Sequence, residues 1–196
     1  PSTAISFIVL AGILLTLFQR TLSELSFWVF VVLTIIVTLF SALEIVGYFT
    51  GMNFNFEDTL VPATGHLGNI PIGRMSVSTG ALFLLAGLAV LALLWRIRID
   101  NSESHLGTFI GVLGILIFVT AIVVCLAYFF GSPFLYGQGD TIPMALTTAL
   151  AFTMLGAAIA GASEEVSIYL RWLSSIIHTE TSEGKRLLSL ALVMAL

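Results

Sequence analysis

The stretch GRMSVSTGALFLLAGLAVLALL, Gly73 to Leu94, passes from a polar turn into an unbroken apolar segment. Two other stretches resemble it, PSTAISFIVLAGILLTLF at Pro1–Phe18 and IPMALTTALAFTMLGAAIAGA at Ile142–Ala162. Each is long enough to cross a hydrocarbon core of about 30 Å as a helix. These three related segments, with the runs between them, decide the fold.

Composition excludes a water-soluble globular domain. Apolar residues make up 58% of the 196 and charged residues only 9%, whereas a soluble domain carries roughly 25% charged residues. The mean hydropathy is +1.10. Because one secretory signal peptide cannot account for five or six apolar runs, we expect an integral membrane protein whose surroundings are the lipid bilayer.

Five apolar runs are long enough to span the membrane, and a sixth begins near the end of the sequence. They are Ala4–Phe18, Phe27–Phe49, Thr79–Trp95, Phe109–Phe130 and Ala145–Ala162, followed by Leu187 to the end. The sequence therefore predicts an all-α fold, a polytopic membrane helix bundle that forms a single transmembrane domain over residues 1–196. Since the first run begins almost at residue 1 and the last stops at Leu196, we expect a longer polypeptide.

The distribution of cations predicts the orientation. Six of the seven lie in the connections after the first, third and fifth runs, namely Arg20, Arg96, Arg98, Arg171, Lys185 and Arg186. Only Arg74 lies on the opposite side. The positive-inside rule then places residue 1 outside and the loops 50–77 and 131–142 outside. We expect a multi-pass protein of the bacterial cytoplasmic (inner) membrane.

The three related segments align without gaps over their cores, at offsets of 76 and 69 residues. Threonines, phenylalanines and small residues coincide at Thr3, Thr79 and Thr148, at Phe7, Phe83 and Phe152, and at Ala11, Gly87 and Gly156. The intervening runs also match at their outer ends, GYFTG at Gly47–Gly51 and AYFFG at Ala127–Gly131. The pattern predicts repeated helical hairpins, with units of approximately 1–74, 75–143 and 144–196, the third incomplete.

Two features of the repeated segments have a physical explanation. Ser, Thr or Pro where each helix begins would cap its free backbone N–H groups, or lack one. Small residues on one helix face let a neighbouring helix approach closely. We expect Gly80, Gly87, Ala149 and Gly156 to serve helix packing; the alternative is a ligand groove lined by these small residues.

The segments MSVSTGALFLLAGLAVLALL and PMALTTALAFTMLGAAIAGA, with LEIVGYFTGMNFNFEDTLV and AYFFGSPFLYGQGDTIPM before them, resemble a known family region. It is the multi-spanning N-terminal membrane region of bacterial PAS, histidine-kinase or GGDEF sensor proteins. The resemblance covers roughly Pro1–Ala162. It implies a sensory role, about eight helices and a cytoplasmic output domain that this chain does not contain.

The sequence thus favours a membrane-embedded sensory module of a bacterial signalling protein, with output elsewhere in the polypeptide. We expect a homodimer or contacts with other membrane subunits. The alternative is a structural or accessory subunit of a larger integral membrane complex. A transporter ranks third, because substrate sites in carriers usually show broken helices or several midplane polar groups.

Glu44, in SALEIVGYF, is the most informative single residue, since a carboxylate inside a membrane span usually faces a bundle interior and a partner. Arg74, the one cation predicted to lie outside, comes just before the next apolar run. A Glu44–Arg74 polar pair at the outer surface would explain both the acid inside a span and the single cation outside, and one hypothesis is that this pair gates or senses. The alternative interpretations are a structural ion pair and an acid that snorkels to water.

No pattern in the sequence indicates a catalytic, metal or cofactor site. His66, His105 and His178 lack metal-ligand spacing, and the adjacent acidic pairs Glu57/Asp58 and Glu164/Glu165 flank membrane runs, where solvation explains them. We therefore expect no enzyme activity and no cofactor. The small scattered net charge of −4 disfavours nucleic acid as a partner.

The segment Ser163–Lys185 is amphipathic, with apolar residues at helical spacing. It predicts a helix lying at the cytoplasmic membrane interface, with Trp172 near the lipid headgroups. Docking on a partner subunit is the alternative.

Overall fold

A computed structural model shows the arrangement of most of the chain. It describes residues 2–19, 22–50, 66–67, 70–71, 75–99, 104–131 and 144–163. The amphipathic segment with Trp172, the sixth apolar run and Arg74 lie outside these residues.

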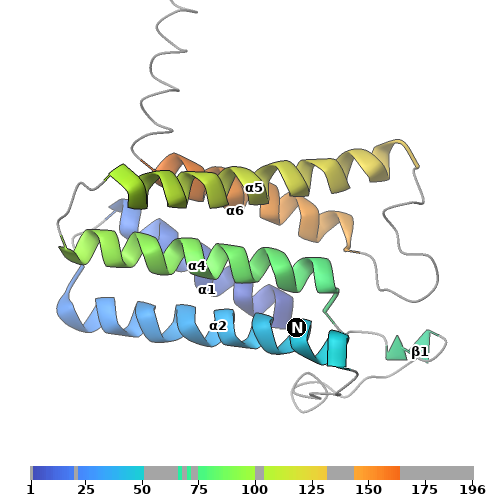
Figure 1. Cartoon of the computed structure of the whole chain (residues 1–196), viewed down its shortest axis with the longest axis horizontal. Coiled ribbons are helices and arrows are strands. Elements are labelled where there is room, and N and C mark those ends of the chain that lie inside the picture. Colours follow the sequence, from blue (N-terminus) through green and yellow to red (C-terminus); the bar gives the residue numbers. More distant parts are fainter. Residues whose placement is uncertain are drawn as a thin grey trace, which may run out of the picture.

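Each of the five predicted spans coincides with an α-helix, although Phe130 and Ala145 lie just outside α5 and α6 (Figure 1). The helices are α1 (Ser2–Gln19), α2 (Glu24–Thr50), α4 (Val77–Ile99), α5 (Ser104–Phe129) and α6 (Leu146–Ala162). Apart from one pairing of two-residue strands and the short turns next to the helices, the described residues are helical, which confirms the all-α prediction. Those strands, β1 (His66–Leu67) and β2 (Ile70–Pro71), pair antiparallel and were not predicted.

Three of the five helices are long and apolar enough to cross a membrane. They are α2, α4 and α5, whose most apolar stretches have mean hydropathies of 2.6, 2.4 and 3.0. The other two, α1 and α6, are equally apolar in character but shorter. Length and composition therefore support a membrane protein and three of the five predicted spans.

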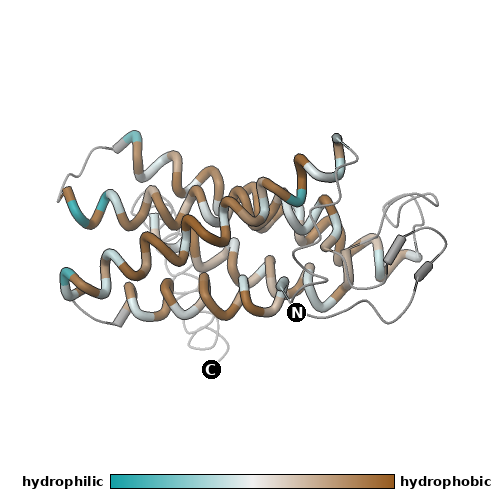
Figure 2. Tube along the Cα trace, turned by 90° about the horizontal axis from the view of Figure 1, so that it is seen from below, coloured by the Kyte–Doolittle hydropathy of each residue, from teal (hydrophilic) through white to brown (hydrophobic). Residues whose placement is uncertain are grey.

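The surface of the described helices is apolar, as a lipid environment requires. Large side chains such as Ile8, Leu25 and Phe129 are 72%, 77% and 80% exposed. Figure 2 shows apolar colour along the helices and hydrophilic colour mainly at their ends. Contiguous exposed apolar faces of this extent are rare on soluble monomers and are normal for helices surrounded by lipid.

Successive helices run in opposite directions, and three of them form the centre of the bundle (Figure 1). The three helices that carry the related segments, α1, α4 and α6, contact one another. Outside them, α2 packs chiefly against α4, and α5 packs against α6 and α4. Each outer helix therefore lies against the central helix that follows it in the chain.

Candidate functional site

A row of polar side chains runs along the face of α2 that meets α4. Thr34, Thr38, Ser41 and Glu44 are all buried, and their spacing of three and four residues places them on one helix face. We call these four residues the polar seam. Buried polar groups inside a membrane helix usually mark an interior contact or a functional site.

The hydroxyl groups of the seam are satisfied by their own helix. Thr34 donates to the Phe30 carbonyl at 2.7 Å, Thr38 to the Thr34 carbonyl at 2.7 Å and Ser41 to the Val37 carbonyl at 2.8 Å. Such bonds to the carbonyl four residues earlier remove the cost of burying a hydroxyl without a partner. None of these three hydroxyls donates across to α4, so at their positions the two helices are joined by side-chain packing.

Small residues of α4 face the seam. A Cβ atom added at Gly87 would meet the Thr38 side chain, and one added at Gly80 would lie 3.4 Å from Ile45 Cγ1 and 3.6 Å from the Ser41 carbonyl oxygen. The absence of side chains at these two positions lets α4 approach the polar face of α2. Gly80 and Gly87 are both buried.

The N-terminal ends of α4 and α6 differ in how they are capped. Before α4, Ser76 Oγ accepts a hydrogen bond from the Thr79 backbone N–H at 3.2 Å and lies 2.7 Å from Thr79 Oγ1. This is the cap that the repeated Ser/Thr pattern predicts. The prediction is wrong for α6, where Ala145 occupies the cap position and no side chain caps the helix. An alanine side chain has no acceptor, so this helix start depends on other contacts.

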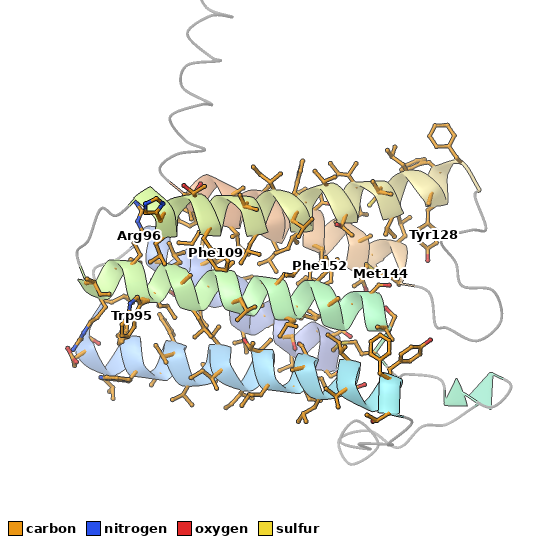
Figure 3. The ribbon with its side chains drawn as sticks, viewed as in Figure 1. Trp95, Arg96, Phe109, Tyr128, Met144 and Phe152 are labelled. Carbon is orange, nitrogen blue, oxygen red and sulfur yellow. The ribbon has the colours of Figure 1, made fainter. Side chains whose placement is uncertain are left out.

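One such contact ties the start of α6 to the end of α5. Tyr128 Oη donates to the Met144 carbonyl oxygen at 2.6 Å, and Figure 3 shows the two residues together at one end of the bundle. The opposite end carries Trp95 and Arg96 (Figure 3).

The contact between α5 and α6 is closer than that between α2 and α4. A Cβ atom at Gly156 would lie 2.6 Å from the Phe118 backbone nitrogen, and one at Gly114 would lie 2.5 Å from the Ala160 backbone nitrogen. Here backbone meets backbone with no side chain between. Of the four small residues in the prediction, Ala149 and Gly156 are both buried on this helix.

The three phenylalanines that coincide in the aligned segments touch one another at the centre of the bundle. The ring centroids of Phe7, Phe83 and Phe152 are 4.7, 4.6 and 4.7 Å apart, with interplanar angles of 59°, 60° and 61°. These values fall in the range of favourable aromatic pairs. We call this group the phenylalanine cluster. The sequence aligned these residues but gave no signal that they meet.

An ion pair joins α2 and α4 at the end opposite Tyr128. Arg98 Nη1 lies 2.8 Å from Glu24 Oε2, and both side chains are substantially exposed. Trp28 Nε1 donates to the other carboxylate oxygen at 3.3 Å, and the Arg98 guanidinium lies 5.2 Å from the Phe27 ring centroid. Sequence reasoning used this cation for orientation and missed its partner. The wide separation along the chain hides the pairing.

Glu44 is the last residue of the polar seam along α2 and is buried, as expected for an acid that faces a bundle interior. Its pairing with Arg74 stays a prediction, because Arg74 lies outside the described residues. Trp172 is outside them as well. Within the described part of the chain, no group of three or more His, Cys, Asp or Glu side chains is arranged to hold a metal ion. No family model, curated protein or solved structure matches this chain.

Proposed function

We propose that this chain is the membrane-embedded sensory module of a bacterial signalling protein, with the output domain elsewhere in the polypeptide. The phenylalanine cluster is the observation that carries the proposal. It links α4, which lies on the polar seam, directly to α6, whose C-terminal end lies at the same end of the bundle as Arg96 and Arg98. A change at the seam therefore has a packed route to that end.

The two helix pairs would respond differently to a stimulus. The hydroxyls of the polar seam bond within α2, so a shift of α4 along the seam would break none of their hydrogen bonds. The Arg98–Glu24 ion pair, which links the same two helices, lies between exposed side chains at the end of the bundle. The contact of α5 with α6 is backbone to backbone and resists such a shift. A stimulus near Glu44 would displace α4, and the phenylalanine rings would pass the displacement to α6 and α5 as one unit.

The same proposal includes five membrane passes. The 18 residues of α1 and the 17 of α6 correspond to about 27 and 26 Å at 1.5 Å per residue. Membrane helices of roughly 17–25 residues are common, and both helices lie among the longer ones. With the cations inside, residue 1 would be extracytoplasmic in the bacterial inner membrane.

The second candidate is a structural or accessory subunit of a larger membrane complex. The close contact of Gly114 with Ala160 and of Gly156 with Phe118 favours it, since such packing also suits a rigid scaffold. In that case the exposed apolar faces would bind neighbouring subunits.

The mass of the native polypeptide, purified from its own membranes and mapped by peptides, separates the two candidates. A mass far above 21.1 kDa, with peptides of a soluble domain after Leu196, is the expected result for a sensory module. A mass near that value, with co-purifying subunits, would contradict it and favour the accessory subunit.

A further inference from the structure

The three central helices bury equivalent positions towards their common centre. At the alignment that superimposes Phe7, Phe83 and Phe152, two further sets are buried in all three helices. These are Leu10, Ala86 and Leu155, and then Leu14, Val90 and Ile159. The centre of the bundle is therefore approximately threefold in side-chain placement as well as in the ring angles of 59°, 60° and 61°.

On a second face, α1 is exposed at positions where α4 and α6 are buried. Three of its positions are exposed, namely Ala4, Ala11 and Phe18, whereas the aligned residues are buried in both α4 and α6. Those buried residues are Gly80 and Ala149, Gly87 and Gly156, and Leu94 and Ser163. The difference is confined to one side of α1, because the positions in question are seven residues apart.

The face in question is the one that α4 and α6 use to bind an outer helix. Gly87 meets Thr38 of α2, and Gly156 meets Phe118 of α5. Thr38 and Phe118 each follow the first residue of their helix, Glu24 or Ser104, by 14 residues. The two outer helices therefore sit in the same antiparallel register on their central helices.

We propose that the exposed face of α1 formed by Ala4, Ala11, Leu15 and Phe18 is the docking surface of a third outer helix, and that the apolar run Leu187–Leu196 belongs to that helix. Along the chain, α2 follows α1 and α5 follows α4, and each begins at the cationic end. The run at Leu187 is the next apolar run after α6 and starts after Lys185 and Arg186, with a longer connection before it. This inference is independent of the signalling function.

The surface of α1 is suited to a helix. Leu15 and Phe18 are 58% and 60% exposed, and an added Cβ at Gly12 would meet no atom within 4 Å. Together with Ile8, the exposed positions of this face recur at alternating intervals of three and four residues, the pattern that packs into a neighbouring helix. In the proposed register, Leu187–Leu196 covers the half of α1 that contains Leu15 and Phe18.

Cysteine cross-linking of the full chain in its own membranes tests the proposal. The native cysteine is first removed by Cys125→Ala. Either Phe18→Cys or Leu15→Cys is then introduced into α1. Each of these two variants is combined with a single second cysteine, placed in turn at every position from 188 to 196. Both α1 positions are exposed, so these substitutions open no cavity. We expect an intramolecular cross-link at one or two positions separated by a helical turn. The preferred position should rise by about three when the α1 cysteine moves from 18 to 15, because antiparallel neighbours run in opposite directions.

The matched control is Val119→Cys, an equally exposed position on α5, which should give no cross-link above background with the same scan. Two results would overturn the proposal. One is cross-linking at all positions from 188 to 196 or at none of them, with no shift of the preferred position between Leu15→Cys and Phe18→Cys. The other is a disulfide-linked dimer formed by Phe18→Cys alone, which would assign this face to a second copy.

Discussion

At the scale of single residues, Gly156 and Gly12 form a matched pair for testing helix contact. A methyl group at Gly156 would meet the backbone of Phe118, which cannot rotate away, whereas one at Gly12 would meet nothing within 4 Å. We expect Gly156→Ala to destabilise the bundle by about 1–3 kcal/mol, as overpacking does. Gly12→Ala should leave stability unchanged or raise it by about 0.5–1 kcal/mol, since alanine favours the helix. Thermal unfolding in detergent measures both; equal effects would show that α5 and α6 are not in this close contact.

Gly87 allows a test of the polar seam itself. An added Cβ there meets the side chain of Thr38 and not a backbone that is fixed in place. Gly87→Ala should therefore lose about 1–3 kcal/mol, and Thr38→Ala in the same chain should restore much of that loss. The free energy of unfolding of both single variants and the double variant gives the coupling, which we expect at about 0.5–3 kcal/mol. Strictly additive free energies would show that Gly87 and Thr38 are not in contact. The control is Thr16→Ala on α1, because the Thr16 hydroxyl also bonds within its own helix.

At the scale of helices, the phenylalanine cluster is the element that joins the three central ones. Phe83 and Phe152 are fully buried, so Phe83→Ala should cost about 3–5 kcal/mol. Double-mutant cycles between Phe7, Phe83 and Phe152, with leucine as the replacement, should give about 0.5–1.5 kcal/mol for each pair. The three coupling energies should be nearly equal, because the three distances between ring centroids, 4.7, 4.6 and 4.7 Å, are nearly equal. A single dominant pair would contradict a threefold centre.

The helices were predictable from the sequence, and their mutual arrangement was not. Apolar runs of membrane length fix where a helix lies, so the predicted Thr79–Trp95 falls inside Val77–Ile99. A helix that is apolar on all sides has no periodic pattern that marks its inward face. The contact between the three phenylalanines could therefore not be predicted from the sequence. The polar residues of α2 are a usable signal for the inward face of that helix, because Thr34, Thr38, Ser41 and Glu44 recur at helical spacing and are all buried.

At the scale of the whole molecule, the alternating direction of the helices makes a definite prediction for the membrane. The ion pair of Arg98 with Glu24 and the neighbouring Arg96 gather at one end, and the Tyr128–Met144 contact lies at the other (Figure 3). The positive-inside rule assigns the first end to the cytoplasm. If all five helices cross, the two ends of α1 must lie on opposite sides, and so must the two ends of α6.

Single cysteines in a Cys125→Ala background decide the number of passes. Ala4 and Ala145 lie near helix ends that the positive-inside rule assigns to the outside, and Leu25 and Gly161 near ends that it assigns to the inside. Because all four residues are exposed, cysteine at these positions leaves the core intact. We expect a membrane-impermeant maleimide to label Ala4→Cys and Ala145→Cys in intact cells, and Leu25→Cys and Gly161→Cys only after permeabilisation. Labelling of Ala145→Cys and Gly161→Cys from the same side would mean that α6 does not cross. Since α6 is the helix through which the proposed signal leaves the phenylalanine cluster, that result would also remove the route to the cytoplasm.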